Sequence, residues 1–407
     1  MRLRTLDDLG DVAGTTVFLR ADFNAPLDGE KVADDTRIRA TLPTIRELLD
    51  RRAHLVAASH LGRPGGKVKD DLRMKPVGDR LAELLEMEVG TVAFPGERSA
   101  DDVAKEVSAF PEDVEEPRRL LLLENLRFDA REEANDQSFA GELAQLTDAY
   151  VDDAFGAAHR AHASVSALPE LMLASGRPAV AGRLLQREVD VLSRLLEGPE
   201  EPYVAVLGGA KISDKLGTIS ALADRVDAML IGGAMAFTLI AADGGEVGES
   251  LVERDRFDDV RRARKHAEER GVLVQLPEDV VAAPEIKADA DRRTVDAAAI
   301  PRGLRGLDIG PRTVEEFART IADAHTILWN GPMGVFELEP FSAGTRGVAT
   351  AIAGSKAFTV VGGGDSLLAV KRLGLENDFD HLSTGGGASL EFLEGRTLPG
   401  IEVLEER

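Results

Sequence analysis

Short aliphatic runs alternate with amphipathic segments along most of the chain. The runs that we expect to form buried strands cover residues 15–22, 54–59, 91–94, 120–124, 150–153, 203–207, 228–231, 272–276, 326–329 and 358–361. Between them, apolar residues recur at helical spacing, as in residues 41–52, 75–85, 313–324 and 366–373. A chain that alternates strands with helices builds parallel sheets with helices on both faces. We therefore predict an α/β fold of two Rossmann-like domains, each a doubly wound parallel sheet.

The middle of the chain predicts a helix that joins these domains. Residues 182–198 read GRLLQREVDVLSRLLEG, and Gly198-Pro199 stops the helix. Four apolar residues are spaced to share one of its faces: Leu185, Val189, Leu192 and Leu196. We expect an N-terminal domain (1–181), the interdomain hinge helix (182–198), a C-terminal domain (199–392) and an extended C-terminal strap (393–407) that packs back on the N-terminal domain.

The composition excludes several classes of protein. Lys and Arg number 49 against 72 Asp and Glu, for a formal net charge of −23, and such a surface repels nucleic acid and anionic lipid. The absence of cysteine excludes disulfides, thiolate metal sites and cysteine nucleophiles. The longest uncharged stretch, residues 228–242, is too short to span a membrane and is interpreted as a buried strand leading into a helix. We expect a soluble, cytoplasmic protein without a nucleic-acid or membrane partner.

Basic motifs follow the expected strands of the first half. RADFNAP contains Asp22 and Asn24, SHLGRP contains His60 and Arg63, ENLRF contains Arg127, DAFGAAHRAH contains His159, Arg160 and His162, and Arg37 lies just downstream of the first motif. Ligands of parallel sheets bind beyond the carboxyl ends of the strands, and guanidinium groups pair bidentately with carboxylate and phosphate. One such arginine alone would more often pair with a surface acid, but the whole set predicts an anion pocket. No third ligand stands at metal spacing from the histidines, so they do not predict a metal site.

Glycine-rich motifs follow the expected strands of the second half. LGGAKISDK carries Lys211 and Lys215 four residues apart, so on a helix they would share one face toward a polyphosphate. In VVGGGDS the glycine amides can approach a phosphate, while Asp365 can hold magnesium and Ser366 can cap the next helix. STGGGASLE repeats this device, and WNGPMGVFE offers Asn330 and Glu337 to a ribose or phosphate. No GxxxxGK[ST] loop occurs, and Trp329 fits the core better than a base-stacking role.

Taken in order, these motifs resemble the phosphoglycerate kinase family over essentially the whole chain: DFN, SHLGRP, LRF, AFGAAHRAH, GGAK, GPMGVFE, GGGDS and STGGGAS. The resemblance implies two Rossmann-like domains joined by a hinge, usually in a monomer. It implies reversible, direct in-line transfer of a phosphoryl group from 1,3-bisphosphoglycerate to ADP after hinge closure, giving 3-phosphoglycerate and ATP with Mg²⁺. Ala158 and Ser366 stand at positions that are often Thr in the family, and neither change removes a group that the mechanism needs.

The resemblance also implies a role for each matching residue. The phosphoglycerate contacts would be Asp22, Asn24, Arg37, His60, Leu61, Gly62, Arg63, Arg127, His159 and Arg160. The nucleotide contacts would be Gly209, Ala210, Lys211, Lys215, Gly232, Gly233, Asn330, Gly334, Glu337, Gly363, Gly364, Asp365 and Ser366, with Asp365 toward magnesium. The catalytic groups around the transferring phosphoryl would be Arg37, Lys215, Gly364 and Gly385.

Two alternatives remain open from the residues alone. One is another acyl-phosphate kinase, for example one that acts on acetate. The number of arginines favours instead a substrate that carries both a carboxylate and a phosphate. The other is a non-enzymatic two-domain protein that binds an anion, which would have no use for the GGAK and GGGDS loops.

Overall fold

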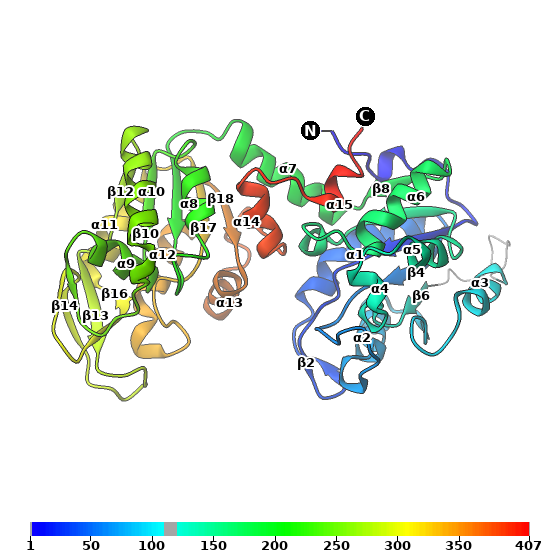
Figure 1. The fold of residues 1–407 in the computed structure, drawn as a ribbon, viewed down its shortest axis with the longest axis horizontal. Coiled ribbons are helices and arrows are strands. Elements are labelled where there is room, and N and C mark those ends of the chain that lie inside the picture. Colours follow the sequence, from blue (N-terminus) through cyan, green and yellow to red (C-terminus); the bar gives the residue numbers. More distant parts are fainter. Residues whose placement is uncertain (1, 110–119, 407) are drawn as a thin grey trace. The chain divides into compact units, whose positions relative to one another are not determined.

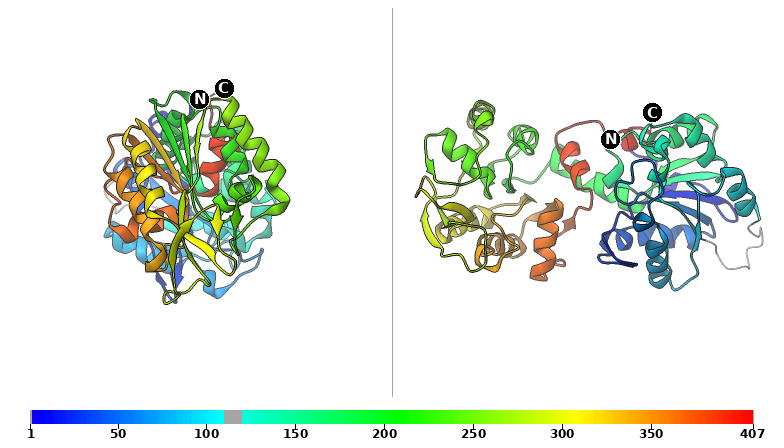
Figure 2. Two further views of the ribbon diagram at one scale, coloured as in Figure 1. Left: turned by 90° about the vertical axis from the view of Figure 1, so that its left-hand side faces the viewer. Right: turned by 60° about the horizontal axis from the view of Figure 1, so that its bottom comes forward.

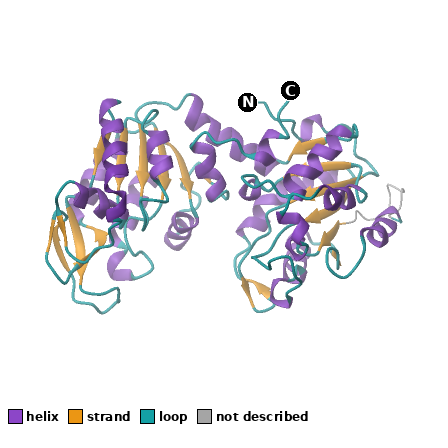
Figure 3. Cartoon of the chain, viewed as in Figure 1, coloured by secondary structure: helices purple, strands orange, loops and turns teal. Residues whose placement is uncertain are grey.

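The computed structural model describes residues 2–109 and 120–406, and the chain divides into two compact units (Figure 1). The N-unit comprises Met1–Asp190 and Thr397–Arg407, and the C-unit comprises Val191–Arg396. Each unit contains a six-stranded sheet with helices packed around it (Figure 3). The prediction of two doubly wound α/β domains is therefore confirmed. No helix in the described part of the chain is both long and apolar enough to cross a membrane.

The N-unit sheet has the strand order β5-β6-β4-β1-β7-β8, and all its neighbouring strands pair in parallel. Its strands are β1 (Thr16–Arg20), β4 (His54–Ala58), β5 (Gly90–Val92), β6 (Leu120–Leu123), β7 (Ala149–Asp152) and β8 (Ala179–Ala181). The carboxyl ends therefore lie along one edge, where Arg20 is in register with Ala58 of β4 and Asp152 of β7. The chain continues from β1 to β4 on one side and returns later to β7 on the other, so the strand order switches beside β1.

Amphipathic helices cover both faces of this sheet (Figure 2). They are α1 (Thr36–Asp50), α2 (Lys75–Leu85), α3 (Ala100–Ser108), α4 (Ala130–Glu133), α5 (Gln137–Ala144) and α6 (Leu168–Ala174). The apolar face of α1 is typical, because Ile38, Ile45 and Leu48 are fully buried in one core cluster with Leu19 and Leu55 of the sheet. Burial of each such side chain stabilises the unit by about 1.5–3 kcal/mol.

The C-unit sheet has the order β12-β10-β9-β17-β18-β19 and is also parallel throughout. Its strands are β9 (Tyr203–Leu207), β10 (Ala228–Ile231), β12 (Leu273–Gln275), β17 (Thr326–Asn330), β18 (Phe358–Gly362) and β19 (His381–Leu382). Its helices are α8 (Leu216–Leu222), α9 (Met235–Ala242), α10 (Phe257–Glu269), α11 (Pro311–Ala322), α12 (Ala343–Ala353), α13 (Gly364–Leu373) and α14 (Gly387–Leu393). The uncharged stretch 228–242 is β10 followed by α9, as expected. Trp329 is fully buried in the core, and its Nε1 donates to the carbonyl oxygen of Gly331 at 2.8 Å.

Several strands were not predicted. In the C-unit, β13 (Asp279–Ala283) pairs antiparallel with β14 (Arg293–Asp296) and with β16 (Arg305–Ile309). Two-residue strands form the pairs β2–β3 (Leu27–Asp28 with Lys31–Val32) and β11–β15 (Glu246–Val247 with Ala299–Ile300). The edge strands β8 and β19 were missed as well. Most of these strands have only two to four residues or carry charged side chains, so their apolar pattern is too weak to read from the sequence.

The segment between the two units is α7 (Arg183–Glu197), and the boundary at Asp190/Val191 falls within it. Leu185, Val189 and Leu192 are buried as their spacing predicted. At the end of the helix the buried residue is Leu195, whereas Leu196 is only half-buried, so the expected face is wrong at that position. In the N-unit, Asp153 Oδ1 accepts hydrogen bonds from the N–H groups of Leu184 and Leu185, at 2.9 and 3.3 Å, and so caps the start of α7.

The end of the chain is not wholly extended, which corrects the prediction of an extended strap. Residues Pro399–Glu402 form the short helix α15, because Pro399 at its first turn is preorganised for helical geometry. The segment lies in the N-unit, where the N–H of Gly400 donates to the carbonyl oxygen of Ala158 at 3.0 Å. A Cβ at Gly400 would come within 2.6 Å of Val165 Cγ1, so only glycine permits this close approach.

Candidate active site

The basic motifs of the N-unit meet at the carboxyl edge of its sheet, beside the point where the strand order switches. The loops after β1, β4, β6 and β7 begin there, and ligands of doubly wound sheets bind at that position. The loop after β1 is fixed to the loop after β4, because the N–H of Gly62 donates to Asn24 Oδ1 at 2.9 Å and the N–H of Phe23 donates to Ser59 Oγ at 2.8 Å. The sequence therefore places distant motifs in direct contact.

Arg37 projects from α1 into this contact region. Its Nη1 lies 3.3 Å from both carboxylate oxygens of Asp22 and 3.2 Å from the carbonyl oxygen of Asn24. Its side chain is about a third exposed, at 36%. The guanidinium is thus held in place by a carboxylate that an incoming anion can replace.

Asn125 and Arg127 join the loop after β6 to the same cluster. Asn125 is fully buried, and its Oδ1 accepts from the N–H groups of both Leu61 and Arg127 at 3.1 Å. Arg127 Nη1 donates to the carbonyl oxygen of Gly62 at 2.9 Å, and its Nε lies 3.4 Å from a carboxylate oxygen of Glu133. Burial lowers the pKa of Arg127, and Glu133 opposes that shift. The structure therefore brings Leu61, Gly62 and Arg127 together as predicted.

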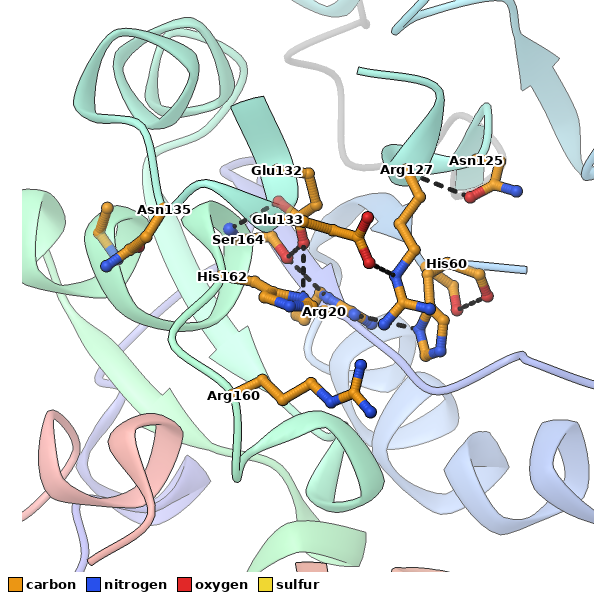
Figure 4. A network of polar contacts seen from close by, with 12 residues as sticks. Arg20, His60, Asn125, Arg127, Glu132, Glu133, Asn135, Arg160, His162 and Ser164 are labelled. Carbon is orange, nitrogen blue, oxygen red and sulfur yellow. Dashed lines mark hydrogen bonds and ion pairs between the residues drawn. The ribbon is translucent and has the colours of Figure 1, made fainter. Parts of the chain in front are cut away.

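His60 lies at the base of the cluster beside Arg20 (Figure 4). Burial lowers the pKa of His60 well below its ordinary value, and the neighbouring charges of Arg20, Arg127 and Arg37 lower it further. The ring is therefore neutral near pH 7. Arg20 Nη2 lies 3.4 Å from His60 Nδ1, within hydrogen-bonding distance.

Arg20 and Glu132 belong to this cluster although the sequence reasoning assigned no role to either. Arg20 is fully buried at the end of β1, and Glu132 is fully buried in α4. His162, which the motif contained, is also buried, and its pKa is lowered to about 3, first by burial and then by Arg127. A charged residue at the end of an otherwise apolar run, as in TVFLR, is the signal that could have found Arg20.

The other predicted triose contacts lie at the rim. Arg160 is exposed, its Nε donates to His159 Nε2 at 3.1 Å, and its charge contributes to the lowered pKa of Arg127. In Figure 4 the side chain of Arg160 lies below those of Arg20 and His162. Arg63 is exposed in the loop after β4. Arg160 is therefore close to the cluster, whereas Arg63 is placed only by the loop that carries it.

In the C-unit, glycine loops converge at the corresponding edge of the sheet. The strand order switches beside β9, and the loops after β9, β10 and β17 touch there main chain to main chain. The N–H of Gly209 donates to the carbonyl oxygen of Pro332 at 3.0 Å, and that of Gly233 donates to Met333 at 3.1 Å. Gly233 has φ of +67°, and a Cβ there would lie 2.6 Å from the backbone nitrogen of Gly209. A Cβ at the predicted Gly232 would collide with the Met333 side chain, so glycine at both positions lets these loops pack tightly against one another.

Lys215 and Asn330 are in contact in this region. Lys215 Nζ donates to Asn330 Oδ1, and Asn330 is itself buried at the end of β17. Burial lowers the pKa of Lys215, whereas the nearby carboxylates of Asp214, Asp365 and Glu394 raise it. Gly363, with φ of +90°, precedes α13, and a Cβ there would lie 3.4 Å from the side-chain nitrogen of Asn330. A phosphate at this edge would meet an ammonium group, glycine amides and the amino terminus of α13.

Two expectations about this region are wrong. Lys211 and Lys215 do not share a helical face, because α8 begins only at Leu216 and Glu253 Oε2 accepts the N–H of Ser213 at 3.0 Å, which holds the preceding residues in turns. Ser366 does not cap α13, because its buried hydroxyl accepts the N–H of Gly331 at 2.6 Å and so ties α13 to the loop after β17.

The remaining predicted nucleotide residues surround this edge less tightly. Ala210, Lys211, Gly364 and Glu337 are exposed, and Gly385 is buried before α14, with its N–H 3.3 Å from Ser383 Oγ. Gly334 packs on Asp308, and a Cβ there would overlap that carboxylate. Glu337 lines an open pocket of about 220 Å³ beside Phe336, Arg346 and Arg372.

The expectation that Asp365 holds magnesium can be tested on the carboxylates of the described residues. No group of three or more His, Asp or Glu in the described residues could enclose a metal ion. Asp365 is exposed in the first turn of α13, close enough to Lys215 to raise its pKa. Mg²⁺ commonly takes one or two carboxylates from a protein and its other oxygen ligands from phosphates and water. A single carboxylate beside a glycine loop fits a magnesium ion that arrives with a nucleotide.

Comparisons with known proteins agree along the whole chain. The family model described as "Phosphoglycerate kinase" matches residues 6–396. Proteins named phosphoglycerate kinase from Thermus thermophilus and Thermomicrobium roseum are 53% and 50% identical over 404 residues, each covering 99% of this chain and 100% of the relative. The solved phosphoglycerate kinase of Coxiella burnetii has a TM-score of 0.87 at 37% identity and covers 99% of both chains. That of Pyrococcus horikoshii has a TM-score of 0.82 at 31% identity, with 99% and 98% covered.

The alternatives of a non-enzymatic binding protein and of a kinase for another acyl phosphate do not account for agreement of this length. Sequence, backbone and ordered motifs match the same group of enzymes from one end of the chain to the other. The chain belongs to the phosphoglycerate kinase family and is an enzyme of reversible phosphoryl transfer in glycolysis.

Proposed function

We propose that the N-unit cluster binds 3-phosphoglycerate and 1,3-bisphosphoglycerate, and that the glycine loops of the C-unit bind ADP and ATP with magnesium. The observation that carries this assignment is the convergence of four strand-end loops on one buried cationic cluster, with Arg127, His60 and Arg37 held by internal hydrogen bonds and ion pairs. A ligand with both a carboxylate and a phosphate matches several guanidinium groups. A Cβ at Gly209 would meet no other atom within 4 Å, so the open backbone there suits the close approach of a polyphosphate.

The chemistry of the acceptor explains why no general base is required. In the direction of acyl phosphate synthesis the nucleophile is a carboxylate with a pKa of about 4, so it is ionised at neutral pH. His60 and His162, both with lowered pKa, serve as neutral groups rather than as bases. Catalysis then rests on positioning and on charge neutralisation.

Arg37 and Lys215 are proposed to meet the transferring phosphoryl group from the two units. Arg37 would give up its ion pair with Asp22 to bind the phosphoryl oxygens. Lys215 would likewise give up its hydrogen bond to Asn330 Oδ1 to bind them. The amides of Gly364 and Gly385 are proposed to add donors to the same group. Asp365 would hold the magnesium ion, which when bound neutralises charge on the nucleotide phosphates.

The two sets of residues belong to different units, so we propose that the units close about α7 before transfer. Reacting atoms must approach to about 3–3.5 Å, and closure also excludes the water that would hydrolyse an acyl phosphate. In keeping with a glycolytic enzyme family, we propose a cytoplasmic monomer.

The test measures turnover and binding separately on the full chain. Turnover of 3-phosphoglycerate with Mg²⁺-ATP, in an assay coupled to reduction of the acyl phosphate, is the expected result, with no turnover of acetate. Calorimetry of Arg127→Ala should show lost binding of 3-phosphoglycerate and unchanged binding of Mg²⁺-ADP. Turnover of acetate in place of 3-phosphoglycerate, or loss of both ligands in this variant, would contradict the assignment.

A further inference from the structure

A buried carboxylate, Glu132, lies behind the cationic cluster, and the transfer mechanism does not use it. It stands in α4, five residues after Arg127, and is fully buried. Its Oε2 accepts the N–H of Ser164 at 3.0 Å, and its Oε1 accepts the hydroxyl of Ser164 at 2.6 Å. Ser164 Oγ accepts in turn from Arg20 Nε at 2.8 Å (Figure 4). Glu132 thus reaches Arg20 through a single hydroxyl.

Arg20 needs such an anion. It is fully buried, and its three hydrogen bonds go to neutral groups: Ser164 Oγ, the carbonyl oxygen of Ala21 and His60 Nδ1. A buried guanidinium without a counter-charge is strongly destabilising. Glu132 and Asp152 interact electrostatically with Arg20, since its charge lowers the pKa of both. Of these two, Glu132 is the one joined to Arg20 by a continuous hydrogen-bond chain.

The hydroxyl of Ser164 gives this chain a direction. A serine hydroxyl has one proton, and here it is donated to Glu132, which leaves a lone pair for Arg20 Nε–H. The carboxylate accepts two hydrogen bonds from the same serine, so it fixes both the backbone and the side chain of Ser164. Burial raises the pKa of Glu132, while Arg20 and the two bonds from Ser164 lower it and favour the anion.

The hydrogen-bond chain that begins at Glu132 ends at His60. When Arg20 Nη2 donates to Nδ1 of a neutral imidazole, the ring proton is on Nε2. Nε2–H is then a hydrogen-bond donor for an anion, as the proposed triose site requires. If Arg20 turned away, the competing tautomer would present a lone pair to that anion instead.

We propose that Glu132 is a positioning residue, which holds Ser164 and, through it, Arg20 in the orientation that gives His60 its Nε2–H tautomer for binding the anionic triose. This inference rests on the proposed triose site. A carboxylate is unexpected beside a site for anions because it repels them, and this inference gives Glu132 a function in substrate recognition. Figure 4 shows Arg20 between Glu132 and His60, so the charge of Glu132 acts first on the buried guanidinium.

Two variants interrupt the hydrogen bonds from Glu132 to Arg20 at different residues. Glu132→Gln removes the charge but keeps the shape, and Ser164→Ala keeps the carboxylate but removes the bridge. Each should raise KM for 3-phosphoglycerate by about tenfold, the effect of losing one charge-assisted hydrogen bond. KM for Mg²⁺-ATP and the melting temperature of the C-unit should not change. The double variant should be little worse than either single one, because both interrupt one network.

The ¹⁵N chemical shifts of the His60 ring provide a second measurement. They would not change if Glu132 and Ser164 only stabilised the fold. In ¹⁵N-labelled protein, the shifts of His60 should show the Nε2–H tautomer in the wild type and a mixture of tautomers in Ser164→Ala. The matched control is Glu142→Gln, a partly exposed glutamate of α5 that pairs with Arg131, the neighbour of Glu132 in α4, without joining the hydrogen-bond chain to Arg20. It should leave both KM values and the His60 shifts unchanged.

The outcomes separate this inference from the proposed function. If the wild type binds 3-phosphoglycerate and Ser164→Ala has normal KM and His60 shifts, the inference fails while the triose site stands. Equal increases in KM for both substrates would also overturn it. Should the wild type fail to bind 3-phosphoglycerate by calorimetry, the proposed function itself fails. Ser164→Ala keeps both charges but leaves Arg20 Nε and Glu132 Oε1 without their shared partner. Circular dichroism shows which of the two variants folds, and a normal KM with normal His60 shifts in either folded variant overturns the inference.

Discussion

Charges in the N-unit cluster are balanced residue by residue before any substrate is present. Asp22 pairs with Arg37, Glu133 with Arg127, and Glu132 reaches Arg20 through Ser164. A fixed cluster of arginines without these partners would repel itself and would be buried without compensation. The arrangement keeps the cations oriented, and the proposed triose would replace Asp22 at Arg37.

The role of Arg37 can be measured directly. Arg37→Ala should lower kcat by about 10²- to 10³-fold, the loss expected when one donor to a developing charge is removed, with a smaller effect on KM. Steady-state kinetics in both directions would show this. An unchanged kcat would remove Arg37 from the transferring phosphoryl group, and Arg39→Ala, an exposed neighbour in the same helix that pairs with Asp35, is the matched control.

The carboxylate of Asp365 is the next single residue to test. Asp365→Asn should weaken the binding of ADP about tenfold in the presence of magnesium and have little effect without it, because one anionic ligand of the ion is lost. Calorimetry with and without Mg²⁺ gives the comparison. If wild-type affinity for ADP does not depend on magnesium, the assignment of Asp365 is contradicted.

At the scale of elements, the strands and loops that could be predicted are those defined by a contiguous stretch of sequence. The strands β9 and β10 and the helix α2 match their expected bounds, because each is a contiguous apolar or periodic segment. The nucleotide roles of Gly209 and Asn330, which stay predictions, could be proposed because a motif contains each of them. Glu132 and Ser164 could not, since they are 32 residues apart and only the fold brings them together. The prediction that Lys211 and Lys215 share a helix was wrong for the same reason, because Glu253, which holds the turn before α8, comes from a distant segment.

One element contact predicts a pH dependence of stability. Asp308, at the end of β16, accepts the N–H of Gly344 at 2.7 Å and so caps α12 from outside the helix. Burial raises its pKa from 3.8 to about 7. Between these pH values the folded protein retains a proton that the unfolded chain has lost. The stabilising contribution of the protonated group is therefore complete below about pH 4 and is lost as the pH rises through 7.

Comparison with Asp308→Asn isolates this contribution. The free energy of unfolding of the wild type, relative to the variant, should fall by on the order of a few kcal/mol between pH 4 and pH 7.5 and then level off. Urea unfolding at a series of pH values measures it. A difference that is constant with pH, or that grows as the pH rises, would show that the pKa of Asp308 is not raised.

At the scale of the whole molecule, triose binding is proposed for the N-unit and nucleotide binding for the C-unit. Lys215→Ala alters the C-unit, so it should leave the affinity for 3-phosphoglycerate within about twofold while lowering kcat by at least about 10²-fold. Calorimetry with the triose and steady-state kinetics on the same preparation give both quantities. Loss of triose affinity in this variant would mean that the two sites are not independent.

The last residues of the chain belong to the unit that the first residues begin. Thr397–Arg407 lies in the N-unit, where the N–H of Glu406 donates to the carbonyl oxygen of Arg2 at 3.0 Å and that of Gly400 donates to Ala158. During synthesis, the C-unit has emerged from the ribosome in full before these partners are available. The unit whose translation starts first is therefore completed only after the whole C-unit has been made, and deletion of residues 397–406 would deprive the oldest part of the nascent chain of its closing segment.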